Sequence, residues 1–410
     1  MVDKVIDYIK ANWEKTMNPP NEKVPFPFNS PSMVFYTDFF YWDLYFINKG
    51  LLLSGLDAQA ENNIKNMVFF INKQGFIPNS TGKYLNNRSQ PPVFPLAVYD
   101  LYRYRNDKKI IEDYIDAAIK EHEFFQTRRM TSIGLNAFMC DESTNSPESI
   151  RNHYKYLSPR VSEYSDKEEE QYQIGKDIIA IAESGLDFNM RFKTEKSKIA
   201  AHEFAHLDLN CWLFAGEIAI SKMLSIIDRK EEAEHFLSLA NKRKELMDKY
   251  FLEKESGLYK DYHLSDGKHS QIITACNLYP YAMGVSNDPK GCLKVLKDLE
   301  MDNGLSTAKY RGESEIYYQW DYPVMWGETV YIAYLALINV GSDEDAERIK
   351  NKYLNTVKKQ FELTGCLWEK YDARDGSIMN IEYDAPPFMG WTAGIYQLFS
   401  TPNTDLLIIV

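Results

Sequence analysis

The 410-residue sequence has only five cysteines, and no two of them form a CxxC pair. They are scattered along the chain as Cys140, Cys211, Cys276, Cys292 and Cys366. An odd number of widely spaced cysteines favours free thiols in a reducing compartment over a disulfide framework. The N-terminal segment MVDKVIDYIKANWEK is amphipathic and carries acidic residues, unlike a signal peptide. We therefore expect a cytoplasmic protein.

Basic residues are in deficit, and long hydrophobic runs are missing. The chain has 47 Lys and Arg against 59 Asp and Glu, for a formal net charge of −12. Nucleic acids and anionic membranes both require basic patches on their protein partners, so we expect neither as a partner. No apolar run approaches the roughly 18 residues of a membrane span. The composition leaves the oligomeric state open.

Glycine-rich phosphate loops and βαβ alternation are also lacking, and helical periodicity is present instead. Apolar residues recur at helical spacing over 1–17, 55–73, 93–105, 109–128, 166–183, 207–227, 229–251, 290–301, 326–341, 343–360 and 390–399. In the pairs 207–227/229–251 and 326–341/343–360, the first segment is apolar nearly all round and the second has a charged face. Such inner and outer helices predict an all-α double ring of helical hairpins. No linker interrupts it, so we expect one domain, 1–410.

The segments between these helices are long and rich in aromatic and acidic residues. They are 18–38, 75–92, 130–163, 185–205, 303–325 and 364–389, and aromatics make up 14% of the whole chain. Acids stand beside aromatics at Asp43, Glu183, Asp187, Asp321, Glu382 and Asp384. Glycoside hydrolysis needs two carboxyl groups across the scissile bond, and aromatic side chains give flat surfaces for a sugar. A single such acid is as readily a helix cap or a surface residue, but several together favour a glycosidase.

The stretch AHEFAHLDLN at 201–210 contains a match to the HExxH motif of zinc hydrolases. That motif binds zinc only when both histidines lie on one face of a helix. Asp208 looks like the N-cap of the next helix, which would leave His202 and His206 outside it. Position 226, about where a glutamate ligand would follow, is Ile226. We therefore expect no metal site here, and no cofactor elsewhere.

Seven segments between residues 40 and 394 resemble the motifs of one family, in the order in which that family has them. They are FYWDLYF (40–46), GFIPNSTGKYLNNRSQPPVF (75–94), SPRVSEY (158–164), AESGLDFNMRF (182–192), DLNCWLFAGE (208–217), YQWDYPVMW (318–326) and WEKYDARDGSIMNIEYDAPPFMGWTAG (368–394). The family is that of the glycoside hydrolase family 37 trehalases, with the related family 63 α-glycosidases. The resemblance implies an (α/α)6 barrel and an inverting α-glycosidase that acts on a small carbohydrate.

The resemblance also implies roles for particular residues. Asp187 matches the family's general acid, and Glu382 matches its general base. The positions that match substrate contacts are Trp42, Asp43, Asn79, Arg88, Gln90, Arg160, Gly185 and Trp320. Asp321 and Glu369 also stand in matching motifs, but the resemblance assigns them no role.

The sequence departs from the family pattern at several positions. Thr37 stands where the family has an arginine, and Leu186 replaces a tryptophan. The glutamate of the family's third motif falls on Ser162, and the glycine run before Glu382 is absent. These departures spare the residues matched to the first sugar, so trehalose is the first candidate substrate and other small α-linked glucosides stay open.

Four readings follow from the sequence. The leading one is a trehalase-type inverting α-glycosidase, with a family 63-like hydrolase of glucosylglycerate or mannosylglycerate as its variant. The second is a sugar isomerase or epimerase, which would use a histidine pair such as His263 and His269. The third is a sugar-binding protein without catalysis, and the fourth is a zinc hydrolase.

Overall fold

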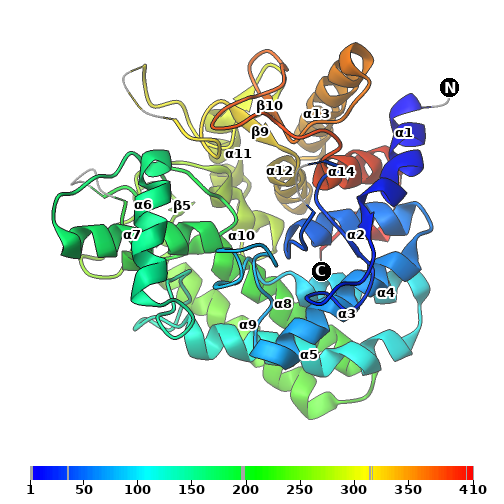
Figure 1. The fold of residues 1–410 in the computed structure, drawn as a ribbon, viewed down its shortest axis with the longest axis horizontal. Helices are drawn as coiled ribbons and strands as arrows, with labels where there is room; N and C mark the ends of the chain where they lie inside the picture. Colours follow the sequence, from blue (N-terminus) through cyan, green and yellow to red (C-terminus); the bar gives the residue numbers. More distant parts are fainter. Residues whose placement is uncertain are drawn as a thin grey trace.

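The structure is a computed structural model that describes residues 3–34, 37–194, 199–313, 315, 317–402 and 404–409 (Figure 1). Its helices are α1 Lys4–Asn12, α2 Asp43–Leu53, α3 Asp57–Gln74, α4 Phe94–Arg105, α5 Lys108–Arg128, α6 Pro147–Val161, α7 Glu168–Glu183, α8 Leu207–Ile226, α9 Lys230–Tyr250, α10 Tyr279–Ala282, α11 Pro289–Leu299, α12 Gly327–Asn339, α13 Asp343–Thr364 and α14 Gly390–Ser400. Residues 1 and 2 of the predicted helix 1–17 lie outside the described residues.

The strands are short and pair only two by two. They are β1 Met17–Asn18, β2 Phe28–Asn29, β3 Phe204–Ala205, β4 Leu252–Glu253, β5 Leu258–Tyr259, β6 Tyr262–His263, β7 Glu300–Met301, β8 Gly304–Leu305, β9 Val324–Trp326 and β10 Lys370–Asp372. The pairs are antiparallel: β1–β2, β3–β6, β4–β5, β7–β8 and β9–β10. They fasten loops to one another and leave the architecture helical.

Six helices close into an inner ring. Each of α2, α4, α8, α10, α12 and α14 contacts the next, and α14 returns to α2. The helices that alternate with them in sequence, α3, α5, α9, α11 and α13, each pack against an inner neighbour, and α1 packs on α14. This double ring confirms the predicted (α/α)6 barrel. Helices α6 and α7, which come between α5 and α8 in the sequence, form an additional pair at the left of Figure 1.

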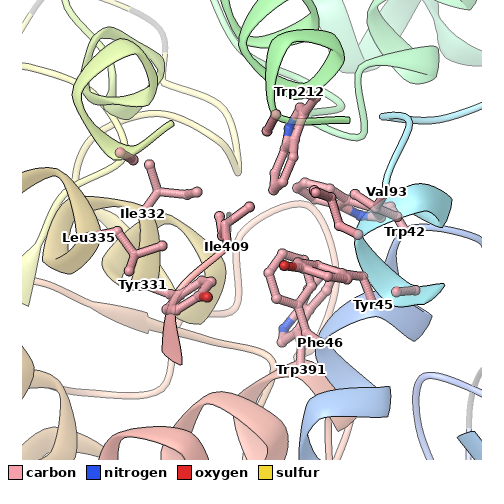
Figure 2. Close-up of a cluster of buried hydrophobic side chains, with 14 of the residues drawn as sticks. Trp42, Tyr45, Phe46, Val93, Trp212, Tyr331, Ile332, Leu335, Trp391 and Ile409 are labelled. Carbon is pink, nitrogen blue, oxygen red and sulfur yellow. The ribbon is translucent and has the colours of Figure 1, made fainter. Parts of the chain in front are cut away.

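Hydrophobicity separates the two rings as the sequence predicted. Helix α8 is buried along nearly its whole length, whereas α9 buries only a stripe. Figure 2 shows side chains from several elements, among them α2, α8, α12 and α14, that fill the centre of the ring. Tyr45 packs edge-on against Trp212 at 6.1 Å between ring centroids, and Phe46 against Tyr331 at 6.4 Å. The ring is therefore plugged by aromatic side chains and does not form an open pore.

Helices α2 and α6 and the four-residue α10 lie outside the segments that the sequence predicted as helical. Asp43, expected in a loop, is the first residue of α2, and α6 lies inside the predicted loop 130–163. Helix α2 is buried on every side, so it lacks the polar stripe that gives a helical period. Helix α6 has apolar residues at helical spacing, but they are few and Pro159 stands near its end, so the segment was predicted as a loop.

Helix α8 passes the length and composition test for a membrane-spanning helix among the described residues. However, 78% of that stretch is buried inside the protein. A core helix of a globular protein passes the same test, and α8 is such a helix because it belongs to the inner ring and packs against α4, α5, α9 and α10.

Candidate active site

A cavity of about 240 Å³ opens at one end of the inner ring. Many of its lining residues stand at or just before the N-terminal ends of inner helices, so this end of the ring is built from helix starts and the loops that lead to them. The lining residues are Pro31, Phe40, Trp42, Asp43, Asn79, Leu85, Arg88, Gln90, Arg160, Ala182, Gly185, Asp187, Gln319, Trp320, Trp326, Glu369, Tyr383, Met389 and Trp391.

The structure brings the sequence-predicted site residues together. The predicted acid Asp187 lines the cavity with all eight predicted substrate residues: Trp42, Asp43, Asn79, Arg88, Gln90, Arg160, Gly185 and Trp320. Glu382 does not line it. Instead, the Glu382 carboxylate contacts two residues that do, since it accepts hydrogen bonds from Arg160 Nε at 2.7 Å and from the Gln319 main-chain N–H at 3.1 Å.

One guanidinium connects the two predicted catalytic carboxyls. Arg160, near the end of α6, donates from Nε to Glu382 Oε2 at 2.7 Å and from Nη1 to Asp187 Oδ2 at 3.4 Å. Its Nη2 also donates to the main-chain carbonyl of Asp187 at 3.2 Å. The carboxyl groups therefore face one another across a cation, and the side-chain exposure is 36% for Asp187 and 14% for Glu382.

The two carboxyls differ in their electrostatic surroundings. Burial raises the pKa of Asp187, and Arg160 and Arg88 oppose that rise only through their charges at a distance or at a long contact. Burial also raises the pKa of Glu382, but Arg160 and Gln319 donate hydrogen bonds directly to this carboxylate and stabilise its ionised form. Glu382 has a φ of 65°, in the left-handed region, so its loop holds it in an uncommon conformation.

Three polar residues fix the wall beside the predicted acid. Gln90 Oε1 accepts the main-chain N–H of Trp42 at 3.0 Å, which anchors the start of α2. The main-chain N–H of Asn79 donates to the carbonyl of Arg88 at 2.8 Å. Arg88 Nη1 donates to the carbonyl of Tyr84 at 3.1 Å, whereas its buried Nε has no hydrogen-bond partner in the described structure. Burial lowers the pKa of Arg88 to about 10, so it stays a cation at neutral pH.

The aromatic wall depends on close approach of the backbone. Gly185 has a φ of 78°, and a Cβ atom there would lie 3.1 Å from Trp42 Cε2. Trp320 stacks on Trp326 at 3.9 Å between centroids, and Trp391 packs edge-on against Trp326 at 5.4 Å. These flat, apolar faces alternate with carboxyl, amide and guanidinium groups, an arrangement suited to a ring-shaped polar ligand.

Two acids that the sequence left without a role have different positions. Asp321 lies away from the cavity and is fully buried, where it accepts a hydrogen bond from the main-chain N–H of Tyr318 at 3.3 Å. Glu369 lines the cavity, and Tyr383 donates to its Oε1 at 3.1 Å. Burial, together with Glu369 and Asp187 nearby, raises the pKa of Asp43 to about 8. Asp43 therefore carries a proton at neutral pH.

Several cavity residues were not predicted from the sequence as site residues. They are Pro31, Phe40, Leu85, Ala182, Gln319, Trp326, Glu369, Tyr383, Met389 and Trp391. The quoted motifs at 318–326 and 368–394 contain six of them, so the signal was present in the flanking letters of those motifs.

The HEFAH match lies outside any α-helix. His202 belongs to a 3-10 turn, Ala201–Glu203, and β3 separates it from His206. His206 Nδ1 accepts the main-chain N–H of Phe138 at 2.7 Å, and its Nε2 donates to the carbonyl of Ala201 at 2.8 Å. Both ring nitrogens of His206 are thus used in structural hydrogen bonds.

Asp208 is not the N-cap that the sequence suggested, because α8 begins one residue earlier, at Leu207. The Asp208 carboxylate instead accepts from Arg191 Nη2 at 2.6 Å. The buried arginine also binds Asp261, so the acid serves a charge cluster and not the end of the helix.

The second histidine pair considered from the sequence lies elsewhere. His263 and His269 line a separate cavity of about 460 Å³, which shares no lining residue with the one around Asp187. His263 Nε2 contacts Glu203 Oε2 at 2.7 Å and its Nδ1 contacts Asp266 Oδ1 at 2.6 Å. The histidines are therefore not placed to act on a ligand held beside Asp187.

Comparisons with known proteins identify relatives of this chain. The chain is 26% identical over 390 residues to a trehalase of Bombyx mori, covering 89% of this chain and 66% of that protein. It is 26% identical over 383 residues to a periplasmic trehalase of Salmonella paratyphi B, covering 88% of this chain and 65% of that protein. The chain thus spans about two thirds of the length of the curated relatives that it matches.

Solved structures share the fold. The neutral trehalase of Saccharomyces cerevisiae superposes with a TM-score of 0.75 at 20% identity, covering 99% of this chain and 81% of that one. A family 63 mannosylglycerate hydrolase from Thermus thermophilus in complex with glucose gives a TM-score of 0.67 at 14% identity, covering 97% and 100%. The model of the trehalase family matches residues 8–401. Because that match covers nearly the whole chain, this protein belongs to the trehalase family.

Proposed function

We propose that this protein is an inverting α-glycosidase that hydrolyses a small α-linked glucoside, with trehalose as the first candidate. The observation that carries the proposal is the pair of carboxyls, Asp187 and Glu382, joined by the Arg160 guanidinium at the aromatic-lined cavity. Inverting glycosidases need one protonated and one ionised carboxyl on opposite sides of the scissile bond. Burial raises the pKa of both carboxyls, and the hydrogen bonds that Arg160 and Gln319 donate to Glu382 favour the ionised form of that residue.

In the proposed reaction, Asp187 donates its proton to the glycosidic oxygen as the bond from that oxygen to the anomeric carbon breaks. Glu382 takes a proton from a water molecule that attacks the anomeric carbon from the opposite face. The sugar leaves with inverted configuration, so an α-linked substrate yields a β-anomer first. Asp187 ends ionised and Glu382 protonated, and exchange with water restores both.

The proposed substrate contacts follow from the cavity wall. Trp42 and Trp320 offer apolar faces to the sugar ring, and Gly185 lets the backbone approach it. Protonated Asp43 donates to or accepts from a hydroxyl, and the unbonded Nε of Arg88 is a free donor in the described structure. Asn79 and Gln90 complete the polar side of the wall. The cavity is smaller than the roughly 300–1,000 Å³ of typical ligand pockets, which favours a small substrate.

A hydrolase of a glycosylated small acid, such as glucosylglycerate or mannosylglycerate, is the second candidate. The observation that favours it is Thr37, which stands where the resembling trehalases have an arginine and does not line the cavity. A site without that arginine offers fewer hydrogen bonds to a second sugar, and discrimination between substrates depends on such groups. The third candidate, a sugar-binding protein without catalysis, would keep the cavity and lack turnover.

One experiment separates these candidates. The purified protein is incubated with trehalose, sucrose, kojibiose, nigerose, glucosylglycerate and mannosylglycerate, and the first-formed anomer is read by NMR. We expect hydrolysis of at least one compound with a β-anomer as the first product. An α-anomer would contradict inversion. Binding measured by calorimetry without any turnover would establish the sugar-binding candidate in place of the enzyme.

We further propose that residues 1–410 form one catalytic domain, since a single hydrophobic cluster draws side chains from Val5 to Ile409. The cytoplasm is the proposed location, because all five cysteines have free thiols and four of them are buried. One relative is named a periplasmic trehalase, so fractionation of cells with an antibody against the protein is the test. The proposed partner is a small carbohydrate substrate, and neither nucleic acid nor membrane is proposed as a partner.

A further inference from the structure

Gln319 contacts both proposed catalytic residues. Its main-chain N–H donates to Glu382 Oε1 at 3.1 Å, and its side-chain Nε2 donates to the main-chain carbonyl of Asp187. The Gln319 side chain is buried, and the main-chain carbonyl of Gln319 accepts a hydrogen bond from Trp326 Nε1 at 2.7 Å. The residue therefore holds the two catalytic segments from one fixed point.

The orientation of the Gln319 amide depends on Lys370. Lys370 Nζ donates to Gln319 Oε1 at 2.8 Å. An ammonium group has no acceptor and a main-chain carbonyl has no donor, so only one of the two amide orientations satisfies both neighbours. With Lys370 in place, the amide must present its oxygen to the lysine and its NH₂ to Asp187.

Lys370 is itself held rigidly. It is fully buried in β10, paired in register with Trp326 of β9. Its Nζ lies 3.1 Å from Glu369 Oε2 and 3.5 Å from the ring centroid of Tyr383. Tyr383 in turn donates to Glu369 Oε1. A buried cation with a carboxylate and an aromatic face as partners is costly to move, so its position is fixed before substrate binds.

We infer that Lys370 is a positioning residue, which acts through the Gln319 amide to hold Asp187 and Glu382 in their relative placement for hydrolysis. This inference rests on the proposed glycosidase function. Lys370 does not line the cavity, and it reaches the catalytic segments through Gln319. Its effect on the reaction is transmitted by one amide and by its charge.

The charge gives the inference a signature that a merely structural lysine lacks. The charged and titratable groups that face Asp187, Glu382 and Lys370 are Asp43, Arg88, Arg160, Tyr318, Glu369 and Tyr383. Arg160, Arg88 and Lys370 oppose the rise that burial causes in the pKa of Asp187. Loss of the Lys370 charge makes ionisation of both catalytic carboxyls harder. Both limbs of the pH–rate profile must therefore move to higher pH.

The test compares Lys370→Met, Lys370→Arg and Gln319→Leu with the double variant Lys370→Met/Gln319→Leu. We expect kcat to fall about 10–100-fold in each methionine or leucine variant, as for a displaced catalytic group. In Lys370→Met both pH limbs rise, and Lys370→Arg restores the limbs. The double variant loses little more than Lys370→Met, because both changes break one connection.

Lys49 provides a matched control. It is also fully buried, its Nζ binds Asp100 at 2.6 Å, and it lies over the ring of Tyr45. Neither partner lines the cavity, whereas Gln319, Glu369 and Tyr383, the partners of Lys370, do. Lys49→Met is expected to lower stability and to leave the pH limbs unmoved. If Lys370→Met does not fold, Gln319→Leu still tests the connection, since the lysine and the main-chain donor to Glu382 stay.

The outcomes separate the inference from the function. Two results would overturn the inference alone, provided that the wild-type protein hydrolyses an α-glycoside. One is a pH–rate profile of Lys370→Met whose limbs do not move, and the other is a fully additive loss of kcat in the double variant. If the wild-type protein hydrolyses no α-glycoside, the proposed function fails and the inference fails with it.

Discussion

Gly185→Ala tests whether the Trp42 wall binds substrate. Gly185 has a φ of 78°, and an alanine in the left-handed region costs about 1–2 kcal/mol. The added Cβ would also stand 3.1 Å from Trp42 Cε2 and 3.3 Å from Cζ2. The indole must then move by a few tenths of an ångström. Because Gln90 holds the main-chain N–H of Trp42, we expect the indole ring to tilt and to change the shape of the cavity.

We expect Gly185→Ala to raise KM and lower kcat/KM by about 10-fold, less than the hundredfold that a displacement of 1 Å can cause. Gly284→Ala is the matched control. Gly284 has a φ of 77°, and no heavy atom lies within 4 Å of the position of its Cβ. In both variants the free energy of unfolding measured in urea should fall by about 1–2 kcal/mol. Only Gly185→Ala should also lower kcat/KM. Equal kcat/KM in the two variants would refute a role for the Trp42 wall.

Other variants test the chemistry and the core. Asp187→Asn and Glu382→Gln should each lower kcat by about 10²–10⁴-fold, with unchanged circular dichroism, and wild-type rates in either would reject that assignment. Arg191→Met breaks a buried ion-pair cluster and should cost about 3–5 kcal/mol in urea unfolding, against about 0–1 kcal/mol for Arg348→Met at the surface. Burial lowers the pKa of His206 from 6.5 to about 4, so the unfolded chain binds more protons below pH 6.5. Stability should therefore fall by about 3 kcal/mol between pH 6.5 and 4, and His206→Asn should flatten that slope.

The parts of the fold that were predictable are those where hydrophobic pattern and burial agree. The segment 343–360 shows a charged face because it belongs to the outer ring of helices, and α13, Asp343–Thr364, covers it. Helix α2 has no such face, and its pattern resembles that of any buried stretch. Helix α6 was missed for a different reason: its apolar residues keep helical spacing, but they are few and Pro159 stands near its end. Periodicity therefore detects helices at an interface with water and fails for a helix that is buried on every side.

The candidate site divides in a similar way. Asp187 and Arg88 carry chemistry in their side chains, so a motif that contains them can be read directly. Gln319 acts in part through its main-chain N–H, which every residue except proline has. Lys370 contacts the site only because β10 pairs with β9, a pairing of three residues that no sequence pattern announces. Gln319 and Lys370 were missed because their contribution depends on where the fold places them and not on their residue type.

The departures from the family pattern are placed so that they spare the inner part of the cavity. Leu186 is buried beside the predicted acid without lining the cavity, and Thr37 is exposed and does not line it either. Arg160, in contrast, comes from the additional helix pair and joins the two carboxyls. The inner helices and the loops that lead to them thus supply most of the cavity wall, whereas α6 supplies Arg160, which contacts both Asp187 and Glu382. Under the proposed function, the second sugar or aglycone is expected to lie beside the segments around Thr37 and Ser162, where this chain departs from the family pattern.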